Sequence, residues 1–585
     1  MQRGSTPNLP GRRRPYPSRI AAAVTGVALL VPALAACRDA GADAAPPPVR
    51  GGALTVYLTN RSVQNLDPQE IVYATDANIS RLINRTLTAT TPTGELVPDL
   101  ATDTGRPSKN NTVWDFTLKP GLAWADGSPV TCDDVRYGIE RRWDPTVAAA
   151  GGLPYPLQYL KDNPKPYKGP ARKENLNSIV CTDARTVEFH LVRSVGDFGY
   201  TVSVPTFAPI QPDADHADTT GQPQNSFTWN PDSNGPYKVD PTKTTFKTIQ
   251  GQQVVMSMLL VRNNYWDQAT DPIRKAYPDT IAIQYNANNA EVTNDLINSV
   301  GQDANAVDLD QNVAPNFVQQ VINDPELSQR AITGLTGSIS YFSINMSRVT
   351  NLDCRKALEY GFDRRTWRYV QGGAVAGDLA TSMIPPSLPA HLDFDLYATK
   401  SFPDGDVKTA QSLMTSAKCR STITVAFPDI PLYHQEVNSV ADAYARIGIQ
   451  VKQVAVPTAD YYTSIGDVKA PYDLMYGGWV PDWPNGSAVI PPLFSSGQLS
   501  GPAAENLNQA HVRDQDAAIQ QAFAEADLTK QYKMWGQLDQ AIMKEAAVIP
   551  IIYPNALRMI GTNVRGVVIS TGNGQPDLAT IGLGS

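Results

Sequence analysis

The fold is decided by the stretch Tyr472-Asp473-Leu474-Met475-Tyr476-Gly477-Gly478-Trp479-Val480-Pro481-Asp482-Trp483-Pro484-Asn485-Gly486. Its first residues alternate like a short strand, and Gly477-Gly478 and two prolines then break the regular pattern. We therefore expect a loop at the end of a strand. The loop carries Asp482 between Trp479 and Trp483, which suits a ligand's ammonium group because the rings exclude water from the carboxylate. The alternative is a surface turn whose tryptophans pack on the domain.

Length and charge limit the classes of protein that fit. The 585 residues exceed what one hydrophobic core organises, so two or three domains are expected, and a hydrophobic content of 42% is that of a globular chain. Residues 1–36 hold five arginines and no acid. Removing these five from 49 Lys and Arg leaves 44 against 57 Asp and Glu, a net charge of −13. An acidic body of this kind disfavours nucleic acid and anionic headgroups as direct partners.

The N-terminus has the features of an export signal. The apolar run 20–36 contains Pro32 and is short for a membrane-spanning helix. It ends in Leu34-Ala35-Ala36-Cys37, which resembles the lipobox of bacterial lipoproteins. This likeness implies cleavage after residue 36 and a diacylglyceryl group on the sulfur of Cys37. Residues 37–50 would then form a flexible linker to the outer face of the membrane. An ordinary signal peptide is the alternative.

The first half of the mature chain shows local folding signals. Leu54–Leu58 alternates like a strand, and 76–85 is predicted to be a helix capped by Asp76. Trp114, Phe116 and Leu118 occupy one face of a further strand, and 186–192 closes the same small sheet. Thr131 and Asp134 form a capping box that opens a helix.

A second α/β region follows residue 341. The segments 422–427, 436–447 and 449–456 read as strand, helix and strand, a βαβ unit with parallel strands. The next strand is the one that leads to Asp482. Ligands of open α/β sheets bind outside the carboxyl ends of the strands, so this order favours a pocket over a surface turn.

Five separated motifs agree with one known family. The chain resembles the extracytoplasmic solute-binding proteins of ABC importers for oligopeptides, dipeptides and nickel, known as solute-binding protein family 5. The resemblance covers residues 54 to 567. It rests on Pro98–Val135, Asn234-Gly235-Pro236-Tyr237, Arg262-Asn263-Asn264-Tyr265-Trp266, Cys354–Arg364 and Tyr472–Pro484.

The resemblance implies an α/β fold of the periplasmic-binding-protein-like II class, a clamshell of two lobes plus an extra inserted domain. Lobe I would be discontinuous, formed from 51–92, 232–330 and 545–585. The extra domain would be 93–231, and lobe II would be 331–544.

Four cysteines remain in the mature chain, and an even number in an exported protein favours disulfides. Three pairings are possible, with buried thiols or a metal site as alternatives. Under the domain division implied above, Cys132–Cys181 and Cys354–Cys419 each lie inside one domain, so these are the pairs we expect.

The resemblance also implies a function and a site. The protein would capture small peptides between its lobes and deliver them to a membrane permease, as a monomer without cofactor, metal or catalysis. Asp482 would pair with the peptide's α-ammonium group and Trp479 would line the cavity. Separately from the resemblance, the positions of Trp483 and Tyr476 beside Asp482 in the sequence make them further expected ligand contacts. The chain has Asp-Trp-Pro-Asn-Gly at 482–486, where the family commonly has Asp-Tyr-Pro-Asp-Pro.

Other functions are open at this point. Nickel chelates, sugars or opines could replace peptide as the ligand, and a receptor for a peptide signal would have the same fold. An extracellular hydrolase is the alternative among enzymes, but the sequence contains no GxSxG, HExxH or phosphate-binding loop. His434 beside Glu436 could suggest a metal, although a solvated histidine at a helix start explains it as well. The five histidines are scattered, at His190, His216, His391, His434 and His511.

Overall fold

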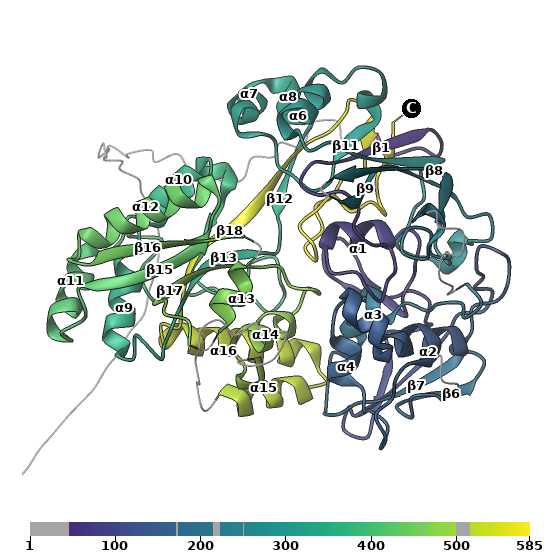
Figure 1. Ribbon diagram of the computed structural model, residues 1–585, viewed down its shortest axis with the longest axis horizontal. Coiled ribbons are helices and arrows are strands. Elements are labelled where there is room, and N and C mark those ends of the chain that lie inside the picture. The colour runs from purple at the N-terminus through teal and green to yellow at the C-terminus, as the bar shows by residue number, and fades with distance from the viewer. Residues whose placement is uncertain are drawn as a thin grey trace, which may run out of the picture. The chain divides into compact units, whose positions relative to one another are not determined.

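The computed structural model describes residues 46–170, 174–214, 223–249, 251–458, 460–467, 469–498 and 515–584 (Figure 1). The described residues from Pro46 onwards belong to one compact unit. The predicted export signal and the lipidation site Cys37 lie outside the described residues. Within the described ranges, no helix combines the length and the apolar character that crossing a bilayer requires.

The first sheet has five strands and joins the start of the chain to its middle. β1 pairs in parallel with β10 and β11, and β9 is antiparallel to both of its neighbours. The predicted strand is present, but it is not half-buried as its alternation suggested: Leu54 to Leu58 are all buried, because the strand is covered on both faces. The strand order is β11 (Ala306–Asp308), β1 (Ala53–Leu58), β10 (Thr280–Tyr285), β9 (Gln252–Arg262) and β8 (Tyr237–Ile249). Its helices include α1 (Ala74–Ser80), α6 (Asn289–Asn298), α7 (Val318–Asn323) and α8 (Pro325–Gln329).

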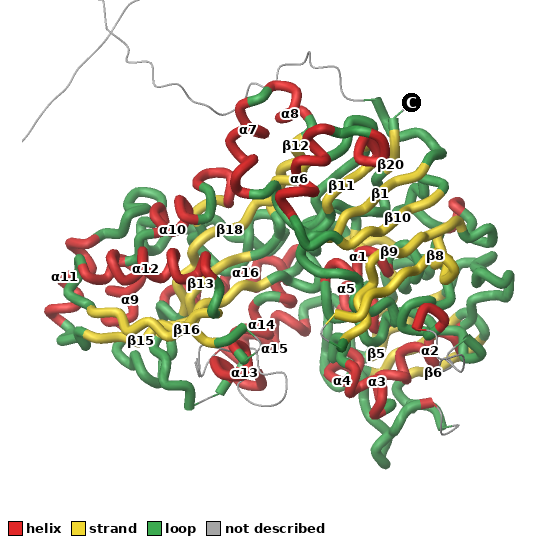
Figure 2. Tube along the Cα trace, turned by 45° about the horizontal axis from the view of Figure 1, so that its top comes forward, coloured by secondary structure: helices red, strands yellow, loops and turns green. Residues whose placement is uncertain are grey.

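The second sheet contains the predicted βαβ unit. β15 and β16 are parallel, with Thr422 opposite Gln450, and β17 is parallel to β15. The order is β12 (Ala331–Leu335), β18 (Val548–Met559), β13 (Ile339–Ile344), β17 (Leu474–Trp479), β15 (Thr422–Pro428) and β16 (Gln450–Val456), with β14 (Gly377–Leu379) beside β18. The helices are α9 (Leu352–Gly361), α10 (Arg364–Val370), α11 (Val407–Ser416), α12 (Pro431–Ala445), α13 (Tyr461–Gly466), α14 (Ile490–Phe494), α15 (Gln515–Ala524) and α16 (Leu528–Lys544) (Figure 2).

The described part of residues 93–231, called the insert below, holds a small antiparallel sheet. The predicted capping box is confirmed, because Thr131 and Asp134 each accept a hydrogen bond from the other's backbone N–H. The order is β4 (Arg106–Ser108), β5 (Val113–Thr117), β7 (Thr186–His190) and β6 (Ile179–Asp183). Beside it lie α2 (Cys132–Glu140), α3 (Pro145–Ala150), α4 (Tyr155–Tyr159) and α5 (Phe198–Thr201). β2 (Thr88–Thr90), just before the insert, pairs with β3 (Leu96–Pro98) at its start.

Two disulfides are present in the structure. One joins Cys132 of α2 to Cys181 of β6, and the other joins Cys354 of α9 to Cys419, which follows α11. The first therefore fixes a helix to the small sheet, and the second links two helices that cover the second sheet.

Two local predictions are wrong. Asp76 does not cap α1, because it lies inside the helix and accepts hydrogen bonds from the backbone N–H groups of Gln64 and Asn65 instead. Gly477 does not interrupt its strand, since β17 continues to Trp479. A Cβ atom at Gly477 would lie 2.7 Å from the ring of Tyr341 on β13, so glycine here permits close strand packing.

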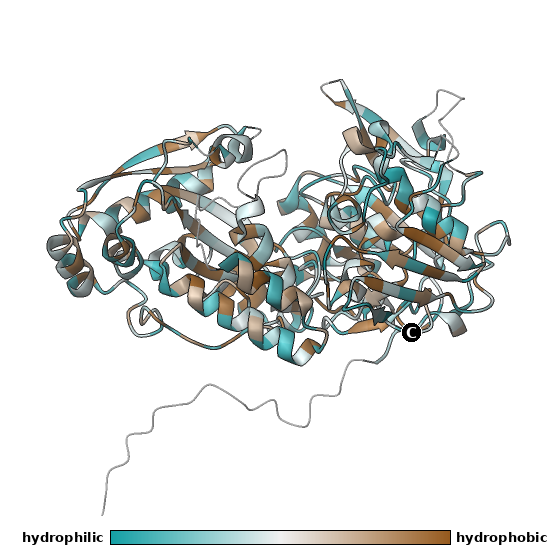
Figure 3. Cartoon of the chain, turned by 90° about the horizontal axis from the view of Figure 1, so that it is seen from below, coloured by the Kyte–Doolittle hydropathy of each residue, from teal (hydrophilic) through white to brown (hydrophobic). Residues whose placement is uncertain are grey.

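The boundary predicted at residue 545 is also wrong for β18. This strand was expected in lobe I, but it pairs with β12, β13 and β14 of the second sheet. The chain returns to the first sheet only at Ile560, which bridges to Val307 of β11. Figure 3 shows hydrophobic residues along the central strands, and all of Val548 to Ile552 are buried.

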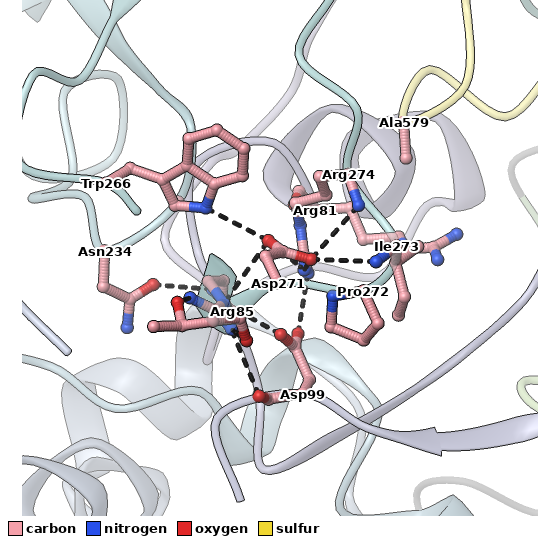
Figure 4. A network of polar contacts seen from close by, with 12 residues as sticks. Arg81, Arg85, Asp99, Asn234, Trp266, Asp271, Pro272, Ile273, Arg274 and Ala579 are labelled. Carbon is pink, nitrogen blue, oxygen red and sulfur yellow. Dashed lines mark hydrogen bonds and ion pairs between the residues drawn. The ribbon is translucent and has the colours of Figure 1, made fainter. Parts of the chain in front are cut away.

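A buried network of charges ties several motifs of the sequence together (Figure 4). Arg85 binds Asp99 at 2.8 Å, and Arg274 binds Asp99 at 2.9 Å and Asp271 at 3.1 Å. These four side chains are at most 2% exposed. Burial alone would raise the pKa of Asp271, but Arg274 and Arg85 outweigh it and hold that pKa well below its usual range.

Two residues of the sequence motifs, Asn234 and Trp266, form hydrogen bonds with members of this network. The Asn234 amide oxygen accepts a hydrogen bond from the backbone N–H of Arg85 at 2.7 Å, and the Trp266 indole donates to Asp271 at 3.1 Å. The guanidinium of Arg274 also donates to the carbonyl of Arg81. The network therefore anchors the residues that follow α1.

We expect Asp99→Ala to reduce the free energy of unfolding by about 3–5 kcal/mol, because it leaves Arg85 and Arg274 buried with one carboxylate between them. Chemical denaturation measures this change. Asp393→Ala, which removes an exposed partner of Lys400, is the control and should leave the denaturation midpoint unchanged. Equal midpoints for both variants would contradict the role given to the network.

Candidate functional site

A pocket of about 310 Å³ lies where four parts of the chain meet. One wall comes from α1 and the residues after it, and another from the loop that follows β17. The insert and the segment after β18 complete it. Since β17 is parallel to β15, the loop leaves the carboxyl end of a strand, as expected for a ligand site. The polar and charged lining residues are Tyr73, Ser80, Arg81, Asn84, Thr86, Thr90, Ser203, Asp482, Ser570 and Asn573.

Asp482 faces this pocket. It retains exposed surface there, and one carboxylate oxygen accepts a hydrogen bond from the hydroxyl of Tyr155 on α4. The surrounding protein replaces much of its hydration and raises the pKa of Asp482 to about 6, against the opposing effect of the Tyr155 hydrogen bond. The Asp482 side chain nevertheless remains exposed to solvent in the pocket, so its carboxylate is accessible to a cationic ligand.

The two tryptophans beside Asp482 hold the loop in place. Trp483 is only 2% exposed, and its indole donates to the Ser487 hydroxyl at 2.8 Å. Its ring meets the ring of Tyr155 edge to face at 4.8 Å between centroids. Trp479 is half-buried and donates to the carbonyl of Ala488 at 2.7 Å. Neither residue is among those that line this pocket, and each makes a hydrogen bond to the segment that follows Asp482.

Tyr476 also lies away from the pocket. Its side chain is in the hydrophobic core between β17 and the covering helices, with centroid distances of 5.6 Å to Trp367 and 4.7 Å to Tyr433. Strand alternation explains this position, because residues on the other face of a strand point away from a site on the first.

The insert holds the loop through a second, buried contact. The Asn485 amide donates to Asp197 and to the Gln531 side-chain oxygen, each at 2.8 Å, and the Ser487 hydroxyl also donates to Asp197. Burial raises the pKa of Asp197, while the hydrogen bonds from Ser487 and Asn485 lower it. Asp197 comes from the insert and Gln531 from α16, so the loop is fixed between the two.

The lining of the pocket also includes an arginine that the sequence did not reveal as a site residue. Arg81 follows α1, binds Asp577 at 3.0 Å, and donates to the carbonyl of Thr90 at 2.6 Å. Its side chain is 19% exposed. The helical pattern of Ile79, Leu82 and Ile83 placed Arg81 away from the apolar face, but nothing local indicated that it would line the same pocket as Asp482.

The described ranges contain no group of three or more His, Cys, Asp or Glu side chains that could hold a metal ion. The ring of His434 binds Asp429 at 2.7 Å on the surface, and the ring of His391 contacts the carbonyl of Ile384. His190 pairs with Glu188 on the small sheet, while His216 and His511 lie outside the described residues.

Comparison with known proteins agrees with this architecture. The model of the bacterial extracellular solute-binding proteins, family 5, matches residues 95–501, more than half of the chain. Proteins of this family bind solutes and are extracellular.

Relatives with assigned names resemble almost the whole chain. The periplasmic oligopeptide-binding protein OppA of Salmonella typhimurium is 23% identical over 88% of this chain and 89% of its own. The dipeptide-binding protein DppE of Bacillus subtilis is 22% identical over 79% of each chain. Among solved structures, clavulanic acid biosynthesis oligopeptide binding protein 2 superposes with a TM-score of 0.81, at 26% identity, covering 92% of this chain and 97% of its own. These matches establish the periplasmic-binding-protein-like fold.

Asp482→Asn is expected to stabilise the ligand-free protein at pH 7.5. The pKa of Asp482 is raised in the folded state, so its contribution to stability is fully present below the unfolded pKa and is lost as the pH rises through about 6. Asparagine avoids this loss. Solvent in the pocket screens the effect, so we expect a gain of at most about 1 kcal/mol. Denaturation at pH 7.5 and 4.5 measures it, and a gain that is equal at both values would contradict the assignment.

Proposed function

Since the chain belongs to family 5 of the bacterial extracellular solute-binding proteins, we propose that it is the substrate-binding component of an ABC importer and captures small peptides in the pocket beside Asp482. The observation that carries this proposal is the Asp482 carboxylate, which lines the pocket and is oriented there by the Tyr155 hydroxyl. A peptide's α-ammonium group is the complementary charge. The names of the relatives, which include oligopeptide- and dipeptide-binding proteins, support the same ligand class.

The pocket favours recognition of a charged end group over any one side chain. In a site that excludes part of the water, an ammonium group and a carboxylate attract each other more strongly than in bulk solvent. The Tyr155 hydroxyl already orients the Asp482 carboxylate, so little rearrangement is needed when the ligand arrives. Varied peptide side chains would be accepted through the solvent that remains in the pocket.

In the proposed transport cycle, the pocket brings together residues of the predicted lobes I and II. Ligand would bind to one lobe, the lobes would close about it, and the loaded protein would present the peptide to the membrane permease. Release into the permease completes the cycle, and no bond of the ligand is made or broken. The protein is therefore a binder and not an enzyme in this proposal, and it acts as a monomer.

A lipid anchor would keep the protein beside its permease. Residues 1–36 would be removed after export, and the diacylglyceryl group on Cys37 would hold the remaining chain at the outer face of the cytoplasmic membrane through linker 37–50. In cells that express Cys37→Ala, we expect the protein in the soluble fraction, where the unchanged chain is expected in the membrane fraction. Immunoblotting of both fractions checks this, and membrane retention of the variant would contradict lipid anchoring.

Asp482→Ala should weaken binding of peptides with a free amino terminus by about 2–5 kcal/mol, roughly 30- to 4000-fold. Titration calorimetry with free and N-acetylated forms of one peptide measures this loss. Asp442→Ala, which removes an exposed carboxylate on α12 outside the pocket, is the matched control and should bind like the unchanged protein. Equal affinity for the free and acetylated peptides would reject the role of Asp482.

A further inference from the structure

A second pocket, called the cationic pocket below, lies at the edge of the second sheet opposite to Asp482. Its volume is about 240 Å³. Residues after β13, the start of α9, the end of α11 and the beginnings of β15 and β16 line it. Asp482 follows the carboxyl end of β17, which is parallel to β15, so the two pockets lie at opposite ends of these strands. They share no lining residue.

Three basic side chains line the cationic pocket, and among its described lining residues none is acidic. The basic residues are Arg348, Lys418 and Arg420. The side chains of Arg348 and Arg420 are 35% and 50% exposed, and Lys418 is exposed as well. Their charged groups are therefore accessible to a ligand. This local excess of positive charge contrasts with the acidic character of the mature chain as a whole.

One buried carboxylate orients both arginines without neutralising them. Asp473, which directly precedes β17, binds Arg348 at 2.9 Å and Arg420 at 2.8 Å, and its side chain is 2% exposed. Its other oxygen accepts a hydrogen bond from the backbone N–H of Thr424 at 2.8 Å. A guanidinium group has five N–H donors, so these contacts leave capacity for an anion on each arginine. With Lys418 included, the group carries an excess of two positive charges.

The other lining residues include a group of apolar side chains. Val349, Leu358, Ile423 and Ile449 belong to the lining and are each at most 7% exposed, and Met414 adds a flexible thioether. Apolar surface of this kind favours a ligand that has an apolar part, because contact with it removes water from both. A combination of apolar lining with a few charged groups is typical of sites for small organic molecules.

The walls of the cationic pocket are fixed in place. Cys354 and Cys419 both line it, and their disulfide ties α9 to the residues after α11, a helix that lies beside α9 (Figure 1). Arg355 donates to the carbonyls of Val349 and Thr350 at 3.1 and 2.9 Å, which holds the loop between β13 and α9. A pocket with such walls needs little rearrangement when a ligand binds.

We propose that the cationic pocket is a second binding site, which takes a small carboxylic acid with an aliphatic tail. The carboxylate would bind Arg348, Lys418 and Arg420 through charge-assisted hydrogen bonds, and the tail would contact the apolar lining. A water molecule takes about 30 Å³ of liquid, so the pocket has room for roughly eight non-hydrogen atoms, as in hexanoate. This site does not depend on the proposed peptide function.

The first test compares three ligands on the unchanged protein by titration calorimetry: hexanoate, its neutral analogue hexanamide, and acetate. Hexanamide should bind about 5- to 30-fold more weakly than hexanoate, because it lacks the charge that the basic residues recognise. Each buried CH₂ group contributes a factor of about four, so acetate should bind more weakly by about 30- to 200-fold. Added salt should weaken hexanoate binding and leave hexanamide binding unchanged.

The second test places the ligand with variants. Arg420→Gln and Lys418→Gln should each weaken hexanoate binding about 3- to 30-fold. In Arg420→Gln the buried Asp473 keeps Arg348 as its partner, so we expect this variant to fold, and circular dichroism checks it. Arg365→Gln is the matched control, because Arg365 is an exposed arginine that pairs with Asp404 outside the pocket. It should bind hexanoate like the unchanged protein.

Each outcome supports or overturns the second site. If hexanoate at millimolar concentration gives no heat of binding, or if hexanamide or acetate binds as tightly as hexanoate, the ligand class is wrong. If hexanoate binds equally to the unchanged protein, Arg420→Gln and Lys418→Gln, the location is wrong. None of these results affects the peptide proposal, which is tested separately with Asp482→Ala and peptide ligands.

Discussion

The ion pairs among Arg85, Asp99, Asp271 and Arg274 are the constraint on which the binding site depends. These charges are removed from water, so each must keep its partners in place, and a small displacement of any one would leave another unpaired. They connect the end of α1, the start of the insert and the turn between β9 and β10. Arg81 and Asn84 are fixed because the backbone around them is held by this network.

The loop with Asp482 depends on a different kind of contact. Its aromatic residues pack behind it, and Asn485 and Ser487 bond to Asp197 of the insert. The pocket therefore joins a wall fixed by ion pairs to a wall held by packing and side-chain hydrogen bonds. A site of this construction keeps its two charged side chains oriented without needing either to be fully buried.

Much of the fold could be predicted because its signals are local. The alternation in 54–58, the capping box at Thr131 and the βαβ order of 422–456 each depend on neighbours in sequence. The partners of β18 could not be predicted, because an apolar run fits the centre of either sheet equally well. The prediction at Gly477 was wrong for a related reason. A glycine pair usually indicates a turn, but here glycine is needed because the ring of Tyr341 on β13 packs against it.

Only part of the candidate site could be predicted from the sequence. Asp482 was predicted as a candidate because its framing residues lie within a few positions of it, whereas Tyr155 and Arg81 come from hundreds of residues away. Side-chain direction was the other missing information: Trp483 and Tyr476 lie close to Asp482 in sequence, yet one is buried behind the loop and the other is on the far side of the strand. Composition identifies the groups that can bind a ligand, but only the fold determines where they point.

The insert shares one continuous hydrophobic core with α15 and α16, in which Tyr159 meets Phe523 edge to face and Phe523 meets Trp535. The insert could not be deleted as an independent unit. Its removal would expose these rings to solvent and would remove the hydrogen bonds between Asp197 and the Asp482 loop. Exchanging the insert between relatives would likewise require transplanting the matching faces of both helices. The segment that looks modular along the chain is therefore the least portable part of the molecule.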